Sequence, residues 1–211
     1  IGVAISDKPQ GPFTAMKNPI THSFSIDPAV FKDDDGSYYM YFGGIWGGQL
    51  QRWRTGIFNA NQPDSPTAFL PDDDEPALLP YVAKMSDDLL EFAEKPKEVM
   101  IVDENGNLLL AGDNDRRFFE AAWLHKYKGK YYFSYSTGDT HFICYAIGET
   151  PYGPFTYKGR ILNPVVGWTS HHSICEFKGK WYLFYHDSSL SKGVTHLRSV
   201  KIAEIKYNED G

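Results

Sequence analysis

A glycine turn followed by a short aromatic strand occurs three times in this chain. The copies read DDDGSYYMYFG at residues 33–43, KYKGKYYFSYS at 126–136 and EFKGKWYLFYH at 176–186. Glycine readily adopts the positive φ of a tight turn, and aromatic residues are favoured in strands. Each copy therefore predicts a β-hairpin, and a chain built from repeated hairpins is expected to be all-β.

A second pattern recurs between the hairpins. Residues 1–13 read IGVAISDKPQGPF and residues 143–155 read ICYAIGETPYGPF, so both combine a strand-like stretch with a Gly-Pro-Phe turn. About 50 positions separate Gly129 from Gly179, a length that suits one four-stranded propeller blade. The alternation of the two patterns predicts a β-propeller.

The chain is expected to begin in the middle of a blade. Residues 1–13 match the segment that follows a hairpin, and we interpret them as the last strand of a blade. A propeller that lacks its first strands would leave open sheet edges. We therefore expect the chain to be N-terminally incomplete and to have the remainder of the propeller as a partner.

Composition narrows the class of protein. Of the 211 residues, 42% are hydrophobic and 23% are charged, as in an ordinary soluble domain. The formal net charge of −6 argues against nucleic acid or an anionic membrane as a partner and favours an uncharged or weakly polar ligand. No apolar run approaches the ~20 residues of a membrane-spanning helix. The compartment stays open: cytoplasmic, periplasmic and secreted locations all fit.

Polar residues occupy equivalent positions ahead of the three hairpins. They are Asp27 in SIDPAVF, Glu120 in RRFFEAAWL, and His171 in TSHHSI, each about nine residues before its turn glycine. The first strand of a propeller blade lines the central axis, so these side chains are expected to converge there. An acid, a second acid and a histidine at one axis indicate a functional site.

Each of these residues also has a structural interpretation. Asp27 precedes a proline and fits a turn or cap, whereas Glu120 lies among aromatic residues, where a carboxylate is rarely structural. Either histidine of TSHHSI fits a hydrogen-bonded core residue. Trp46, in GGIWGG, fits either a platform for a sugar or packing within its loop, and Arg198 fits either the site or a surface ion pair.

Several ordered motifs resemble those of glycoside hydrolase family 43. They are SIDPAVFKDDDG, RRFFEAAW, GKYYFSYSTGDTH, PYGPF, HHSI and GKWYLFYH, and together they extend over nearly the whole chain. Members of this family are five-bladed β-propellers that act on xylan and arabinan side chains and oligosaccharides. The sequence is most similar to its β-xylosidases and α-L-arabinofuranosidases.

The resemblance assigns the blades. It implies roughly the last three blades of five, plus the final strand of the preceding one. The expected boundaries are 1–20 for the end of the second blade, 24–100 for the third blade with an inserted loop, 117–165 for the fourth and 170–211 for the fifth.

The resemblance also implies roles for the candidate residues. Glu120 matches the general acid, and Asp27 matches the aspartate that modulates its pKa. His171 matches an axial histidine that helps to hold calcium with waters, Arg198 resembles an arginine that reaches the sugar, and Trp46 is a further substrate-binding candidate. The general base, an aspartate in an Asp-Pro motif of the first blade, has no counterpart in this chain.

The expected function is therefore that of an inverting glycosidase. It would release xylose or arabinofuranose from plant-cell-wall oligosaccharides, with calcium as a possible ion and no organic cofactor. Three alternatives stay open: a non-catalytic carbohydrate-binding propeller, a fragment that is inactive without its N-terminal blades, and a related fold acting on fructans, which the HHSI and GPF motifs fit less well.

Overall fold

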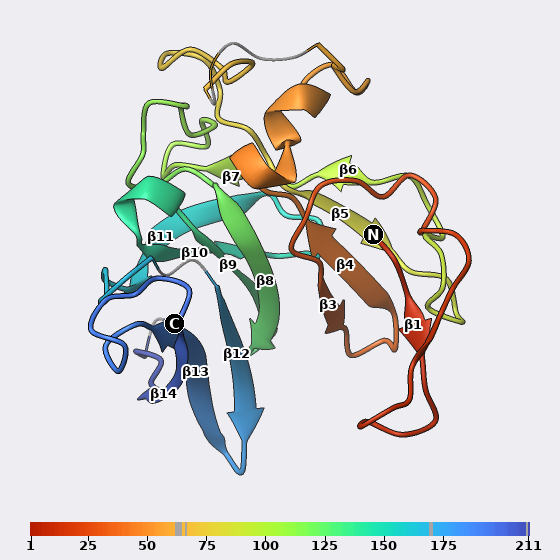
Figure 1. Ribbon diagram of the computed structural model, residues 1–211. Helices are drawn as coiled ribbons and strands as arrows, with labels where there is room; N and C mark the ends of the chain where they lie inside the picture. Colours follow the sequence, from red (N-terminus) through yellow and green to blue (C-terminus); the bar gives the residue numbers. More distant parts are fainter. Residues whose placement is uncertain (62–64, 66, 169–170, 210) are drawn as a thin grey trace.

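The computed structural model describes residues 1–61, 65, 67–168, 171–209 and 211. The predicted start of the fifth blade, at residue 170, lies outside this part of the chain. Regular structure within it is almost entirely β, as Figure 1 shows, and three short 3-10 turns are the exception. No helix among the described residues is both long enough and apolar enough to cross a bilayer.

The first large sheet has four strands in sequence order. They are β3 (Ala29–Lys32), β4 (Tyr38–Phe42), β5 (Tyr81–Lys84) and β6 (Lys97–Glu98), and all neighbours are antiparallel. Two 3-10 turns, η1 (Trp46–Gly48) and η2 (Leu50–Trp53), open the long connection between β4 and β5.

The second large sheet has the same up-and-down order, with one strand added at its outer edge. It consists of β8 (Glu120–Tyr127), β9 (Lys130–Ser136), β10 (Ile143–Gly148) and β11 (Phe155–Leu162), and the short β7 (Ile101–Val102) pairs parallel to β11. The 3-10 turn η3 (Gly138–Thr140) connects β9 to β10.

The third large sheet has three antiparallel strands. They are β12 (His172–Phe177), β13 (Lys180–Asp187) and β14 (Ser199–Ile205). The three predicted hairpins are therefore confirmed as β3–β4, β8–β9 and β12–β13. In the last two, a Lys-Gly pair forms the two-residue turn, and both residues have positive φ, as in Lys128 (47°) and Gly129 (78°).

The N-terminal segment differs from the prediction. Instead of one final strand over residues 1–13, it forms two short antiparallel strands, β1 (Ala4–Ile5) and β2 (Thr14–Ala15). The matching segment 143–155 contains β10, and its Gly-Pro-Phe turn leads into β11. At this turn the chain reverses and continues into a further strand. A strand-like stretch with a Gly-Pro-Phe turn therefore indicates a strand that is followed by another one, not the last strand of a blade.

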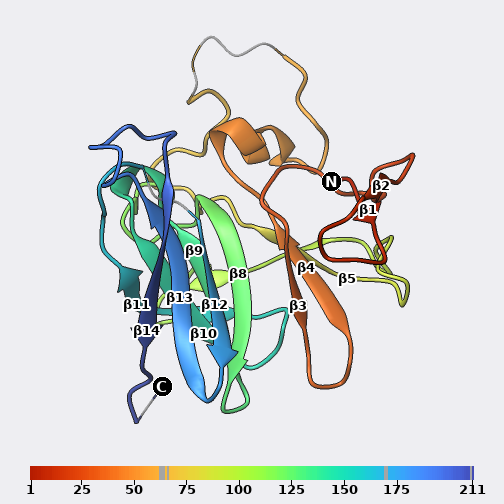
Figure 2. The ribbon, with the colours of Figure 1, turned by 60° about the horizontal axis from the view of Figure 1, so that its bottom comes forward.

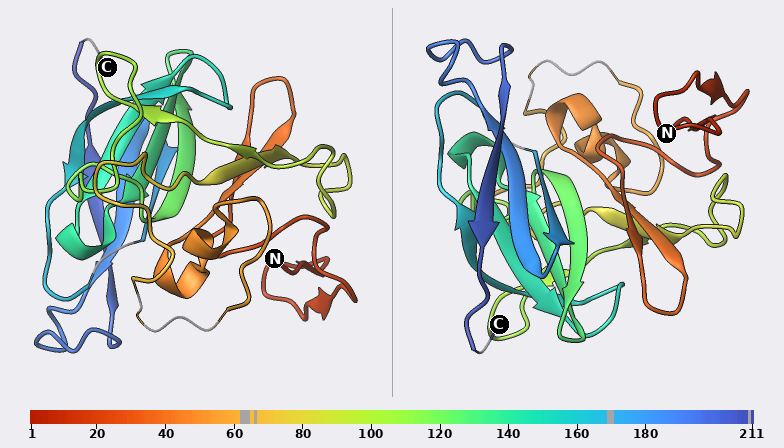
Figure 3. Two further views of the ribbon diagram at one scale, coloured as in Figure 1. Left: turned by 90° about the horizontal axis from the view of Figure 1, so that it is seen from above. Right: turned by 90° about the horizontal axis from the view of Figure 1, so that it is seen from below.

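Strand β8 lies at the centre of the molecule. It lies beside β3 on one side and beside β12 on the other, so the first strands of the three large sheets are neighbours (Figures 1 and 2). Seen from above, the loops after β4 and before β8 lie over the same end of these strands (Figure 3). The start of each first strand, where the candidate residues lie, therefore faces one common region.

The main core lies between the first and second large sheets. Tyr41, Phe133 and Phe155 have no exposed side-chain surface, and Tyr41 packs on Phe133 with ring centroids 5.7 Å apart. The buried Tyr41 hydroxyl donates a hydrogen bond to the carbonyl oxygen of Pro151 at 2.5 Å. Burying such rings contributes roughly 1.5–3 kcal/mol each, which anchors the two sheets against each other.

Candidate active site

The three polar residues expected at the axis come together. Asp27 precedes β3, Glu120 is the first residue of β8, and His171 precedes β12. One ligand atom from each of them lies within 4.8 Å of the others. In the part of the chain that the structure describes, this is the cluster of acidic and histidine groups able to hold a metal ion.

The backbone is unusual at Asp27 and at the residue that follows Glu120. Asp27 has φ 59° and Ala121 has φ 61°, a region that costs energy for residues other than glycine. The ladder between β8 and β9 is irregular between Glu120 and Trp123, as in a β-bulge. The Ala121 N–H donates to Asp27 Oδ2 at 3.4 Å. The bulge thus connects the two carboxylate-bearing segments directly.

The loop between β4 and η1 packs closely against the residues around the two carboxylates. An added Cβ at Gly44 would lie 2.7 Å from Ile26 Cγ1 and 3.4 Å from Glu120 Cβ. The Gly44 N–H donates to the Ser25 hydroxyl at 2.9 Å. This loop therefore touches the residue before Asp27 and the side chain of Glu120 at once, and only glycine leaves room for both contacts.

His171 contacts Asp27 and is partly open to solvent. Its Nε2 lies 3.2 Å from Asp27 Oδ2, and 45% of its side chain is exposed, compared with 16% for Asp27. The hydrogen bond to Asp27 raises the pKa of His171; burial opposes this, and the charges of Asp27 and Glu120 support it. The Asp27 carboxylate therefore favours the protonated form of this imidazole.

The adjacent histidine has a different role. Nε2 of His172 lies 2.6 Å from the Ser134 hydroxyl, and burial lowers the pKa of His172 to about 3. It is a hydrogen-bonded, partly buried residue at the start of β12. The structure thus distinguishes the two histidines of the pair: His171 contacts the carboxylate cluster, and His172 is the hydrogen-bonded structural residue.

Arg198 and Trp46 lie around the cluster. Arg198 is close enough to His171 for its charge to oppose protonation of that histidine, and its Nε donates to the Thr195 carbonyl oxygen at 3.1 Å. Trp46 packs edge-on against Phe119, with ring centroids 5.1 Å apart. Trp46 therefore lies beside the residue that precedes Glu120.

Sequence reasoning missed a cavity on the other side of Phe119. Arg117 and Asp139 line it together with Trp46, and its volume is about 190 Å³. The motif RRFFE contains Arg117, but a single arginine beside an aromatic pair carries no signal for a site. Only the meeting of several loops defines this cavity.

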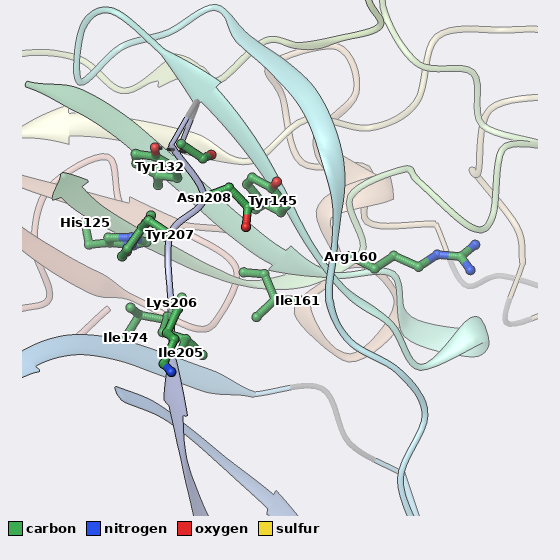
Figure 4. Close-up of a pocket in the computed structure, with 11 residues that line it drawn as sticks. His125, Tyr132, Tyr145, Arg160, Ile161, Ile174, Ile205, Lys206, Tyr207 and Asn208 are labelled. Carbon is green, nitrogen blue, oxygen red and sulfur yellow. Dashed lines mark hydrogen bonds between the residues drawn. The ribbon is translucent and has the colours of Figure 1, made fainter. Parts of the chain in front are cut away.

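A second cavity lies elsewhere. Figure 4 shows its lining by His125, Tyr132 and Tyr207, among others, and its volume is about 280 Å³. Among the described residues, those of the carboxylate cluster do not line it. Its histidine is held at 2.6 Å from the Tyr207 hydroxyl and stacks on Tyr132. We interpret this cavity as a packing defect beside an aromatic cluster.

Two adjacent carboxylates at the open end of an all-β scaffold are typical of enzymes that cleave glycosidic bonds. The family model "Glycosyl hydrolases family 43" matches residues 1–67 and 79–211. The chain belongs to this family, as the sequence motifs predicted.

Its relatives are longer. A protein named "Xylosidase/arabinosidase" from Bacteroides ovatus is 61% identical over 100% of this chain and 63% of its own length. "Xylosidase/arabinosidase 43A" from Humicola insolens is 62% identical over 100% of this chain and 65% of its own length. The chain thus spans less than two thirds of these relatives.

A solved structure is similar over the whole chain. It is a GH43 β-xylosidase/α-arabinofuranosidase from a compost microbial metagenome, described as a complex with xylotriose in a calcium-free form. It has 68% sequence identity and a TM-score of 0.95, and the match covers 100% of this chain and 63% of that one.

Proposed function

We propose that the protein is an inverting glycoside hydrolase that releases xylose or arabinofuranose from xylan or arabinan oligosaccharides. The observation that carries this proposal is the Asp27–Glu120 pair, held within 4.8 Å at the start of two neighbouring first strands. Family membership and the names of the similar proteins support the same substrate class.

Glu120 is the general acid in this proposal. Its carboxyl protonates the glycosidic oxygen as the bond to the anomeric carbon breaks, and the leaving sugar departs as a neutral alcohol. Aromatic residues flank it, since Phe118 and Phe119 are both buried. An apolar setting of this kind disfavours the ionised form of a carboxyl group, as an acid catalyst requires.

Asp27 modulates the acid and is not the base. Inverting enzymes separate acid and base by roughly 6.5–9.5 Å to leave room for a water molecule. Asp27 and Glu120 approach within 4.8 Å, which is too close for that water. Two carboxylates at this separation disfavour the state in which both are ionised, and the Ala121 N–H orients Asp27 toward the acid.

The general base is assigned to a carboxylate in the portion of the relatives' length that this chain does not span. It would take a proton from the attacking water on the face of the sugar opposite Glu120. The released sugar then carries the inverted configuration. Because the relatives are longer than this chain, we also propose the N-terminal remainder of the protein as its structural partner.

The complete protein is proposed to be a five-bladed propeller, of which this chain forms three blades and part of a fourth. Large apolar side chains are exposed on strands at the edges of its sheets. Val30 on β3 is 48% exposed, and Val200 and Ile202 on β14 are 75% and 61% exposed. Apolar strand faces of this kind need a covering layer, and additional blades would supply it.

Arg198, Trp46 and His171 are proposed to contact the sugar. Arg198 is an exposed cation near His171, suited to hydrogen bonding with sugar hydroxyls. Trp46 presents a half-buried aromatic surface beside the acid segment. His171 is open enough to be reached by a ligand that rests on the carboxylate pair.

We also propose calcium near His171. His171 would contribute one ligand, and because an imidazole is a poorer ligand for calcium than an oxygen, waters would fill most of the shell. His171 would hold the ion, which would supply positive charge beside the carboxylates. The compost enzyme is described in a calcium-free form, which makes calcium the ion to test.

The test is Glu120→Gln in the full-length protein. Glycosides with poor leaving groups should lose activity by about 10²–10⁴-fold, the usual contribution of a general acid. Aryl glycosides with very good leaving groups need little protonation and should retain more. Unchanged turnover of xylosides with poor leaving groups would contradict the assignment. Binding of xylotriose without cleavage by the wild-type protein would instead favour a carbohydrate-binding protein.

A further inference from the structure

A cluster of charged and aromatic side chains joins β3 to β8 at the strand ends that are far from the candidate active site. Asp33 follows Asp27 by six residues, and Lys126 follows Glu120 by the same number. Nζ of Lys126 lies 2.8 Å from Oδ1 of Asp33. At ~3.3 Å per residue of a strand, this ion pair is roughly 20 Å from the carboxylates of the site. The two strands therefore approach each other through ionisable side chains at both ends.

The cluster satisfies both oxygens of Asp33. Oδ1 also accepts the Asp34 N–H at 2.8 Å, and Oδ2 accepts the Tyr131 hydroxyl at 2.6 Å. Nζ of Lys126 lies 2.8 Å from Asp34 Oδ2 as well, and 4.7 Å from the centre of the Tyr131 ring. Only 8% of the Asp33 side chain and 21% of the Lys126 side chain are exposed. This ion pair is thus held more firmly than one between two mobile surface side chains.

Both partners of the pair are ionised near neutral pH. Burial acts to raise the pKa of Asp33, but the hydrogen bonds from Lys126 and Tyr131 hold this pKa below its ordinary value. The hydrogen bonds to Asp33 and Asp34 raise the pKa of Lys126. A mostly buried ion pair adds little stability compared with apolar side chains of similar size, because both charges lose their hydration. The contribution of this pair is therefore expected in the geometry that it enforces.

β3 and β8 belong to different sheets. In the described part of the chain, no ladder of backbone hydrogen bonds joins them, although they lie side by side (Figure 2). The start of β8 is weakly restrained, because its ladder with β9 is irregular between Glu120 and Trp123. The Ala121 N–H reaches Asp27 Oδ2 only at 3.4 Å. The tilt of β8 against β3 therefore depends on side-chain contacts elsewhere along the two strands.

A backbone hydrogen bond at the site end supplies one fixed point. The Ile45 N–H donates to the Phe119 carbonyl oxygen at 3.0 Å, which holds the residue before Glu120 against the loop after β4. One fixed point does not set the angle of a stiff strand, whereas a second point far from the first does. The packed core limits the tilt to small angles, but a catalytic group must lie within about 0.5 Å and 10–20° of its productive geometry. Asp33 and Lys126 form the second point.

We propose that Asp33 and Lys126 are a positioning pair: by fixing the tilt of β8 against β3, they orient the Glu120 carboxyl toward Asp27 and the glycosidic oxygen. The inference rests on the proposed glycosidase function, in which Glu120 is the general acid. Tyr131 supports the pair, because its hydroxyl binds Asp33 and its ring contacts Lys126. The pair acts on the reaction only through Glu120.

The test uses the full-length protein and two xylosides, one with a poor and one with a very good leaving group. Only the poor leaving group needs strong acid assistance, so the ratio of its kcat to that of the good one reports how well Glu120 delivers its proton. Unfolded or inactive protein lowers both kcat values equally and leaves this ratio unchanged. The ratio therefore distinguishes a positioning role from a merely structural one.

Lys126→Met removes the charge and keeps a side chain of similar length. The kcat for the poor leaving group should fall about three- to tenfold, because a small misplacement of a catalytic group slows the reaction. The kcat for the good leaving group and both KM values should change less than about twofold. Lys126→Arg keeps a cation beside Asp33 and should restore the wild-type ratio. Tyr131→Phe removes one hydrogen bond to Asp33 and should lower the ratio about twofold, which decides the question if Lys126→Met does not fold.

Lys180→Met is the matched control. Nζ of Lys180 lies 2.8 Å from Glu204 Oε2, but this ion pair joins β13 and β14, two strands of one sheet. Its loss should leave the ratio at the wild-type value. Glu120→Gln in the same assay gives the full change in the ratio that follows from loss of the acid.

Three results would overturn the inference while the proposed function stands. They are an unchanged ratio in Lys126→Met and Tyr131→Phe when Glu120→Gln changes it, an equal change in Lys180→Met, and a ratio in Lys126→Arg as low as in Lys126→Met. If the wild-type protein cleaves neither xyloside, or if Glu120→Gln leaves the ratio unchanged, the proposed function fails and the positioning role fails with it.

Discussion

Nε2 of His171 lies 3.2 Å from Oδ2 of Asp27, so an imidazole and a carboxylate from different sheets meet at the start of β3 and β12. The contact raises the pKa of His171, because the Asp27 carboxylate favours the protonated imidazole. It also occupies the oxygen of Asp27 that receives the Ala121 N–H. Asp27 therefore holds two neighbours through one oxygen, which suits a modulating residue.

Asp27→Asn should lower kcat about tenfold to a hundredfold, a part of the 10²–10⁴-fold that a general acid contributes, with KM changed less. The amide keeps an acceptor for the Ala121 N–H but removes the negative charge beside Glu120. Kinetics on a xyloside with a poor leaving group measures the effect. Azide distinguishes the roles: if it restored turnover and produced a glycosyl azide, Asp27 would be the base instead.

Removal of calcium should lower the thermal midpoint and the activity of the full-length protein, and calcium should restore both better than magnesium. The reason is that a cation near His171 screens the repulsion between Asp27 and Glu120. His171→Ala should abolish the calcium-dependent shift of the midpoint. If exhaustive chelation changes neither quantity, the calcium proposal is wrong.

Gly44→Ala should destabilise the protein by about 1–3 kcal/mol and reduce kcat, because the new methyl group overpacks the site. The added Cβ would lie 2.7 Å from Ile26 Cγ1, next to Asp27, and 3.4 Å from Glu120 Cβ. Denaturant unfolding and kcat measure the two effects. The matched control is Gly47→Ala in the same loop, where no atom lies within 4 Å, and it should be nearly neutral.

The stability of the protein should fall in acid because of His125. Burial lowers the pKa of His125 to about 3, so the folded protein holds it neutral, while the unfolded chain takes up a proton near the ordinary value of 6.5. Between these two pKa values the unfolded state binds more protons than the folded state. Each unit by which the pH falls in this range therefore lowers the free energy of unfolding by about 1.4 kcal/mol through this group.

His125→Phe should flatten this dependence between pH 6 and 3, measured by urea unfolding at each pH. Part of the slope should remain, because the pKa of His172 is lowered to about 3 by the same cause. The absolute stability will also change, since the contact with the Tyr207 hydroxyl at 2.6 Å is lost. An unchanged slope would show that His125 is protonated in the folded protein.

Much of the scaffold follows from local sequence. The glycine turns and aromatic strands predicted the hairpins, because a positive φ at glycine and alternating burial are properties of a few consecutive residues. The equivalent positions of Asp27, Glu120 and His171 before the hairpins predicted their meeting, because repeated units place equivalent residues at equivalent points in space. The segment with the first Gly-Pro-Phe turn was wrongly predicted to be the last strand of a blade, because the sequence of a turn does not show whether another strand follows it.

The sequence by itself thus determined the all-β hairpins and the three polar residues that converge. Only the tertiary structure decided which histidine of the pair faces Asp27, how closely Asp27 approaches Glu120, and that a cavity lies behind Phe119. The physical reason is that these features depend on interactions between residues that are far apart in the sequence. The cavity depends on pairing between segments such as 73–77 and 109–112, and the conformation of such loops is set by partners far away in the chain.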